Sequence, residues 1–285
     1  MRNNEDRLGG ALETSEAPLV NTTNDSSNNS GPLNFVVPTD FVELPSQGTF
    51  YSEGHALYNQ KTIEIRQMTA KDEDILTSRA LLQQGLAIDR LIDNLIVNKN
   101  IQAKSLLIGD KNAIMVTARS SAYGNVYETA VQCPYCSQHS EHAFDLNETL
   151  ALKEITDETT SNLTENATYK TILPTNNVEV EIKFLTSGDE RKLMNLAEQR
   201  RKHKLLDTSV TDQMKAFIVS VNGVSDRSDI AQFVNSMPAK DARHVRSVYA
   251  SAAPNIDLTQ DFICKFCLTE TKLEVPFTTD FFWPR

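Results

Sequence analysis

The stretch "VQCPYCSQHSEHAFDL", Val131–Leu146, holds two of the chain's four cysteines in a Cys-x-x-C step. The other two cysteines form a second Cys-x-x-C step in "DFICKFCLTETKLEVPF". In both places a strand-like segment runs into the first cysteine, and a short polar turn and another strand-like segment follow the second. The sequence therefore predicts two similar Cys-x-x-C hairpins, separated by residues 137–263.

Two such hairpins can hold one metal ion. Zinc favours a tetrahedron of thiolates, and a Cys-x-x-C step on a tight turn presents two sulfurs to the same ion. The chain supplies four cysteines and no spare one, as a single closed site requires. We therefore predict a structural zinc ion in a zinc-ribbon-like β element, with these ligands: Cys133, Cys136, Cys264 and Cys267. The long gap requires that the ends of the intervening segment lie close together.

Other interpretations of the cysteines remain open. If the two steps were redox motifs, each Cys-x-x-C would lie at the start of a helix. Here a polar turn and a strand-like segment follow each cysteine pair, which disfavours a redox role. Structural disulfides are disfavoured in a reducing compartment. A local site could instead join Cys133 and Cys136 with His139 and His142, although this spacing is tighter than that of zinc fingers.

Composition and missing motifs exclude several classes of protein. The 285 residues carry a formal net charge of -10, which argues against a general binder of nucleic-acid phosphates. The chain has no apolar run long enough for a membrane span and no signal-peptide pattern at its start. A catalytic zinc would need an open ligand position and a water-activating carboxylate, yet no H-x-E precedes "CPYC". We expect a cytosolic, non-enzymatic protein.

The predicted fold class is α+β, with a strand-plus-helix module inserted between the two hairpins. Residues 1–33 contain no aromatic residue and are expected to be a disordered tail. The first module, 34–145, combines helices with the first zinc knuckle. The inserted module covers 146–254, and 255–285 holds the second knuckle and an aromatic C-terminal tail.

Local signals predict particular helices and strands. Thr69 followed by Asp72 is a helix-start signature, and Ser187 with Glu190 predicts a capping box at the start of another helix. Alternating apolar residues on both sides of 174–177 predict a hairpin. The segment 105–124 reads as a short segment, a turn at Gly109 and Asp110, and then a helix or a strand. A further helix is expected from Ser209, with one apolar stripe: Val210, Met214, Phe217, Ile218 and Val221.

Two segments are candidates for contacts with partners. The basic run "EQRRKHK", 198–204, is typical of the end of a solvated helix, with a nucleic-acid or acidic-partner contact as the alternative. The C-terminal aromatic residues Phe281, Phe282 and Trp283 either close the core or dock on a partner.

Several segments together resemble the baseplate hub family of T4-type, contractile-tailed bacteriophages. In order along the chain they are "FVELPSQGTFY", "IEIRQMTAKDEDIL", "CPYC" with "FDL", "SMPAKDARHVRSVYASAAPNIDL", "CKFC" and "VPFTTDFFWP". The resemblance covers roughly 34–145 and 210–285.

The resemblance implies a non-enzymatic role in tail morphogenesis, as a hub component or a hub assembly factor. Expected partners are other baseplate hub proteins and the tape-measure protein, with no membrane and no nucleic acid. The expected location is the host cytoplasm during assembly, or the tail baseplate of the virion. The alternative is that the chain is a zinc-ribbon protein with a nucleic-acid-binding or regulatory function.

Overall fold

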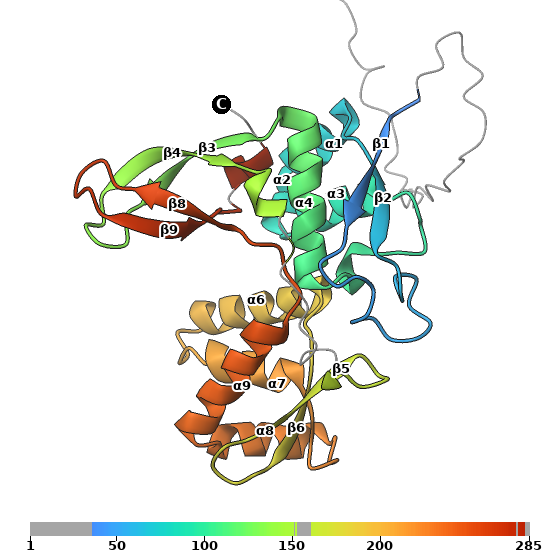
Figure 1. The fold of residues 1–285 in the computed structure, drawn as a ribbon, viewed down its shortest axis with the longest axis vertical. Helices are drawn as coiled ribbons and strands as arrows, with labels where there is room; N and C mark the ends of the chain where they lie inside the picture. Colours follow the sequence, from blue (N-terminus) through green and yellow to red (C-terminus); the bar gives the residue numbers. More distant parts are fainter. Residues whose placement is uncertain (1–35, 151, 153–160, 278, 283–285) are drawn as a thin grey trace, which may run out of the picture. The chain divides into compact units, whose positions relative to one another are not determined.

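The computed structural model describes residues 36–150, 152, 161–277 and 279–282. In this part the chain forms eight α-helices and nine strands in four small antiparallel sheets, which confirms the α+β class (Figure 1). The described residues from Val37 onward belong to one compact unit, called the larger unit below. The tail predicted at 1–33 lies outside the described residues, and the division of the larger unit into three modules stays a prediction.

The helices and strands follow one another in mixed order. The α-helices are α1 (Ala70–Thr77), α2 (Arg79–Gln83), α3 (Ala87–Leu95), α4 (Ile108–Tyr123), α6 (Ser187–Lys202), α7 (Ser209–Phe217), α8 (Arg227–Ser236) and α9 (Ala239–Ala252). The strands are β1 (Thr39–Glu43), β2 (Thr62–Arg66), β3 (Val126–Gln132), β4 (His139–Asp145), β5 (Thr168–Ile172), β6 (Glu179–Lys183), β7 (Ile218–Val221), β8 (Thr259–Ile263) and β9 (Glu270–Glu274). Among the described helices, none has the length and apolar character needed to cross a bilayer.

The helix start predicted at Thr69 is confirmed, and Thr69 forms a capping box with Asp72 at the start of α1. Asp72 accepts hydrogen bonds there from the Thr69 N–H at 2.8 Å and from both guanidinium nitrogens of Arg66 at 2.7 and 2.8 Å. Asn94 of α3 donates to the same carboxylate at 2.6 Å. One buried acid thus ties β2, α1 and α3 together.

Helix α4 occupies the interior of the larger unit. It contacts β1, α6 and the 3-10 turns η3 (Glu148–Leu150) and η4 (Thr279–Phe282). Its buried residues lie on all sides of the helix: Ala113, Ile114, Met115, Val116, Ala118 and Arg119. Because an all-round apolar helix has no clear periodicity, the sequence pattern left this segment undecided.

A buried carboxylate in α4 holds the long connection between β1 and β2. Asp110 accepts from the N–H and hydroxyl of Ser46, at 3.0 and 2.7 Å, and from the Tyr51 hydroxyl at 2.7 Å. The Tyr51 oxygen in turn accepts from the N–H of Leu107 at 3.0 Å. Burial raises the pKa of Asp110 even though these hydrogen bonds act to lower it.

Two local predictions in the inserted segment need correction. The hairpin of β5 and β6 is confirmed, but the helix from Ser209 ends at Phe217, and 218–221 becomes β7 on the edge of β6. The β-branched Ile218 faces Ile182 across the two strands, so pairing in the sheet overrides the helical stripe. The cap of α6 is Thr186 with Asp189, one residue before the predicted pair, because the Thr186 hydroxyl accepts from the Asp189 N–H.

The inserted segment rejoins the first part of the chain at a close backbone crossing. After α9 the chain passes over the first turn of α4, where a Cβ atom on Gly109 would overlap the carbonyl oxygen of Pro254. Only glycine allows this approach. The crossing directs the following strand, β8, toward the β3–β4 hairpin.

Candidate metal centre

The β3–β4 and β8–β9 hairpins have the same construction and lie side by side (Figure 1). Their last strand pairs, Gln132 with His139 and Ile263 with Glu270, close the loops 133–138 and 264–269. Each loop begins with the first cysteine of a Cys-x-x-C step. The predicted pair of similar hairpins is therefore confirmed.

The two loops repeat the same hydrogen bonds. Cys133 donates its N–H to the Gln138 carbonyl at 2.9 Å, and its own carbonyl accepts from the N–H of Ser137 at 2.9 Å. The loop around Cys264 has both bonds at the equivalent positions, at 3.1 and 3.0 Å. The residue after each second cysteine, Ser137 or Leu268, has a left-handed φ of 58° or 57°. Each loop is thus a tight knuckle with both sulfurs on one side.

All four sulfur atoms lie within 4.8 Å of one another. The Sγ atoms of Cys133 and Cys267 are 3.8 Å apart, and those of Cys136 and Cys264 are 3.6 Å apart. A tetrahedral site with metal–sulfur bonds of about 2.3 Å would place its sulfurs about 3.8 Å from one another. A disulfide needs about 2.05 Å, and all four cysteines are free. The cluster is compatible with metal binding.

The hydrogen bonds of the second knuckle favour thiolates. Contacts with the hydroxyl and backbone of Thr269 lower the pKa of Cys267 to about 6. The backbone N–H groups of Cys267 and Phe266 lower the pKa of Cys264. The backbone at Gln138 acts to lower the pKa of Cys136, but desolvation and the neighbouring thiols raise it to about 12. Four thiolates at this spacing would repel one another unless a cation lay among them.

The histidines of the first hairpin are not part of the cluster. Among the described residues, the four cysteines are the one His/Cys/Asp/Glu group with metal-binding spacing. His142 packs edge-on against Phe144 and Phe262, with ring centroids 4.6 and 5.2 Å away, and His139 is exposed. The alternative of a local site with two imidazoles has no support in this part of the chain.

Side chains that the sequence reasoning missed hold the two hairpins together. Gln260 of β8 accepts from the Asp145 N–H at 3.0 Å and donates to the Asp145 carbonyl at 2.5 Å. The Tyr127 hydroxyl donates to the Pro276 carbonyl at 3.3 Å. The sequence did contain a signal for Gln260. Buried and exposed residues alternate along β8, and Gln260 lies two residues before Phe262, so both side chains fall on the buried face.

Two of the three C-terminal aromatic residues are buried. Phe281 and Phe282 are 0% and 2% exposed, which is the first of the two roles expected for them, closing the core. The Phe281 ring lies edge-on to Tyr127, Phe277 and Phe282, with centroids 4.9–5.1 Å apart. Trp283 lies outside the described residues.

A buried guanidinium explains why Phe281 is held inside. Arg119 of α4 donates to the carbonyls of Phe281 at 2.7 Å, Gly124 at 2.8 Å and Val126 at 3.3 Å. These bonds fasten the C-terminal segment and the start of β3 to the same helix. The cysteine cluster is therefore built on a well-packed base.

Comparison with known proteins gives one match. A family model described as T4 bacteriophage base plate protein matches residues 39–283, which includes the segment 146–209 that the sequence resemblance did not cover. No curated protein and no solved structure matches the chain significantly. The matched region contains all four cysteines and both knuckles. The chain therefore belongs to the T4 bacteriophage base plate protein family.

Proposed function

We propose that this protein acts without enzymatic activity in building the central hub of the phage baseplate, as a hub component or a hub assembly factor. The observation that carries the proposal is the family match across residues 39–283. Membership of a baseplate family implies contacts with other structural proteins of the phage. The proposed partners are other hub proteins and the tape-measure protein, met in the host cytoplasm during assembly or in the finished tail.

We also propose that the cysteine cluster holds one zinc ion with a structural role. The support is the set of four thiols at tetrahedral spacing, 3.6–3.8 Å across the two hairpins. Four protein ligands fill a tetrahedral zinc and leave no position for a reacting water. A bound zinc would supply folding free energy by joining two hairpins that are far apart in sequence.

The contacts of the basic run argue against the nucleic-acid alternative. Arg200 pairs with Asp212 at 3.3 Å, and Lys202 pairs with Glu198 at 2.9 Å. Phosphate binding through Arg200 or Lys202 would compete with these pairs, on a chain whose net charge is already -10.

The role in assembly can be tested with a phage whose gene for this chain carries a nonsense mutation. We expect infected cells to accumulate no complete baseplates by electron microscopy, and the wild-type chain supplied in trans to restore them. Normal baseplates without the chain would contradict the proposal. Mass spectrometry of purified virions then separates a hub component, which stays in the tail, from an assembly factor, which does not.

The zinc proposal is tested by elemental analysis of the purified chain. We expect one zinc per chain, and loss of both metal and cooperative unfolding in Cys264→Ser. His139→Ala and His142→Ala serve as matched controls and should keep the metal. A metal-free wild-type chain of unchanged stability would refute the zinc site and leave the baseplate role standing.

A further inference from the structure

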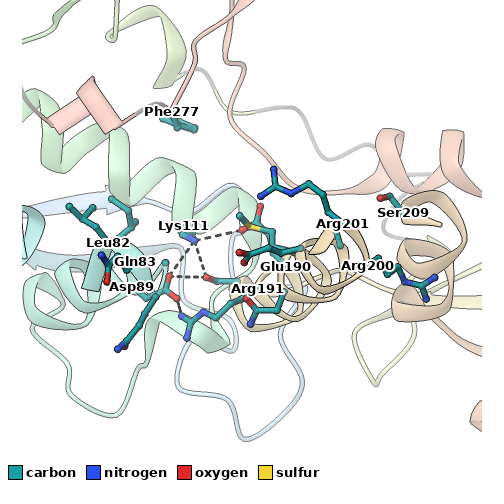
Figure 2. Close-up of a pocket in the computed structure, with 18 of the residues that line it drawn as sticks. Leu82, Gln83, Asp89, Lys111, Glu190, Arg191, Arg200, Arg201, Ser209 and Phe277 are labelled. Atoms are coloured by element: carbon teal, nitrogen blue, oxygen red, sulfur yellow. Dashed lines mark hydrogen bonds and ion pairs between the residues drawn. The ribbon is translucent and has the colours of Figure 1, made fainter. Parts of the chain in front are cut away.

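Two surfaces of the molecule differ in how well their polar groups are balanced. A groove runs between α6 and the helices α2, α3 and α4 (Figure 2), and four acidic and four basic side chains line it. Figure 2 shows Asp89 between Lys111 and Arg191, and its carboxylate pairs with both. The groove therefore favours a partner of neither sign. The free edge of β3, by contrast, is unbalanced in both hydrogen bonding and charge.

The register of the first hairpin shows which backbone groups of β3 face away from β4. Both strands are seven residues long and pair in an unbroken register. At one end of the hairpin the Asn125 carbonyl accepts from the Leu146 N–H at 2.8 Å. At the other end Cys133 donates its N–H to the Gln138 carbonyl at 2.9 Å. Because backbone groups alternate in direction along a strand, the odd-numbered residues of β3 face β4 and the even-numbered ones face away.

The outward backbone groups are open from Glu128 to Gln132. Before this stretch the edge is closed, since the Val126 carbonyl accepts from the Arg119 guanidinium at 3.3 Å. Beyond it, no described residue bonds to the outward N–H or carbonyl groups of Glu128, Ala130 or Gln132. Three successive outward residues can thus each exchange hydrogen bonds with an added strand.

Other strand edges of the fold are covered. Ile65 of β2 bridges to Ile96, and Tyr169 of β5 bridges to Leu163. At the end of β4 the Gln260 side chain binds the backbone. Within the described ranges no residue bridges to β3 in this way, and β4 is its one strand partner. An open edge of this kind is suited to pairing with another chain.

The face of the sheet that carries this edge is acidic. The even-numbered residues of β3 pair with odd-numbered residues of β4, and the side chains of both sets are exposed. Three of them are acids: Glu128, Glu141 and Asp145. The sequence has no Lys or Arg between Arg119 and Lys153. The face itself therefore has three negative charges and no positive one.

The second hairpin does not reverse this charge. The two hairpins together, 126–145 and 259–274, contain six acidic residues against two lysines, which leaves a formal charge of -4. One of the lysines, Lys272, lies opposite Asp261 in the pairing of β8 with β9. Neither Glu128 nor Glu141 forms an ion pair with any residue that the structure describes.

The acids select the strand that can pair here. A carboxylate beside an open edge repels an acidic neighbour across the strands and favours a basic one. A second copy of the chain is disfavoured for the same reason, because pairing β3 with β3 would bring together three acids from each copy. Since alternate side chains of a strand share one face, the complementary segment has Lys or Arg at every second position.

We propose that the edge of β3 receives an extended, basic segment of another baseplate protein, which adds a third strand to the β3–β4 hairpin. Backbone hydrogen bonds along 128–132 supply affinity, and basic side chains facing Glu128 and Glu141 supply selectivity. This inference rests on the proposed function.

The test uses the full chain during phage assembly, with p-benzoylphenylalanine in place of Val126, which is 59% exposed at the start of β3. After irradiation of infected cells, mass spectrometry identifies the cross-linked segment. We expect a segment of another baseplate protein with Lys or Arg at alternate positions. The same label at Val224, which is 49% exposed in the inserted segment, is the control and should not capture it. Cross-linking of position 126 to a second copy, to another part of this chain, to nucleic acid or to a segment without alternating bases would overturn the proposal.

A pair of proline variants tests the backbone pairing. The Ala130 N–H faces away from β4, so Ala130→Pro removes one outward donor and keeps the bonds between β3 and β4. We expect it to lower the cross-link yield at position 126 by about fivefold, as loss of about 1 kcal/mol of binding would. Ala143→Pro is the matched control, because its N–H faces the opposite edge of the same hairpin. Equal yields in two variants that keep the wild-type Tm would exclude strand addition.

A charge reversal tests the selectivity and leaves the strand intact, so it decides the question even if Ala130→Pro does not fold. We expect Glu128→Lys to lower the yield at position 126 by about tenfold. Changing the partner's facing base to Glu should restore it. Glu53→Lys, on an exposed residue of the connection between β1 and β2, should have no effect. An unchanged yield in Glu128→Lys would show that the edge does not select a basic segment.

One further readout separates the two proposals. If the chain is present in purified baseplates but position 126 cross-links no better than position 224, the strand-addition proposal fails alone. If the chain neither enters baseplates nor is needed to build them, the proposed function fails as well.

Discussion

Replacing Phe281 by alanine should destabilise the whole larger unit. The ring is fully buried and meets three other aromatic rings edge-on. Truncating a buried phenylalanine to alanine typically costs about 3–5 kcal/mol. The surrounding rings cannot collapse into the space without losing their own contacts, which favours the middle of this range or above. We therefore expect a loss of about 4 kcal/mol.

The measurement is urea unfolding with excess zinc, followed by circular dichroism. The free energy of unfolding comes from the midpoint and the slope of the transition. In a thermal scan the same loss should lower Tm by roughly 8–16 °C for a unit of this size. Phe41→Ala is the control, because Phe41 is 69% exposed and its removal should change stability by less than about 0.5 kcal/mol.

The result that would refute the reasoning is a loss below about 1 kcal/mol in Phe281→Ala. If baseplate assembly failed while stability stayed unchanged, Phe281 would act at a partner surface, and its burial against Arg119 would not hold in solution.

Three further predictions follow from other parts of the fold. Gly109→Ala should abolish cooperative unfolding or expression of soluble chain, since its Cβ overlaps the Pro254 carbonyl; a stable variant would show that the crossing is looser than described. Burial raises the pKa of Asp72, but hydrogen bonds from Arg66 and Thr69 outweigh this effect and lower it to about 2 from 3.8. The ionised form therefore stabilises the fold above about pH 4, and this contribution is lost as the pH falls through about 2. Urea midpoints measured against pH should fall less steeply for Asp72→Asn than for wild type, and equal slopes would exclude this role. A chelator should lower Tm reversibly, with recovery on adding zinc; an unchanged Tm would contradict a structural metal.

The pairing of the cysteines could be predicted because ligand chemistry constrains it strongly. Four thiols and no spare allow one closed site, and a strand on each side of Cys-x-x-C indicates a hairpin. Neither inference depends on the inserted segment, 146–254. The structure adds what the pattern could not supply, such as the bridge from Gln260 to Asp145.

The errors arose where a distant partner decides the local structure. Ile218 fits a helical stripe with Phe217, and only the free edge of β6 turns it into a strand residue. The burial of Phe281 depends on Arg119, which lies 162 positions earlier in the chain. The groove between α6 and the helices α2, α3 and α4 could not be predicted as a whole, since separate helices supply its walls and the basic run 198–204 indicated only one part of its lining.

Because the two knuckles lie so far apart in the sequence, the four-cysteine cluster can form only after nearly the whole chain has been synthesised. A ribosome has already made 34–145 and the whole inserted segment before it adds Cys264 and Cys267. Until then the first knuckle has two thiols and no second knuckle to pair with. The contacts that join the two knuckles link cysteines 134 and 128 positions apart, so a long loop must close to form them. A chain interrupted before position 264 cannot form the four-thiol cluster. If the cluster binds zinc as proposed, metal content would distinguish finished chains from fragments that end before position 264.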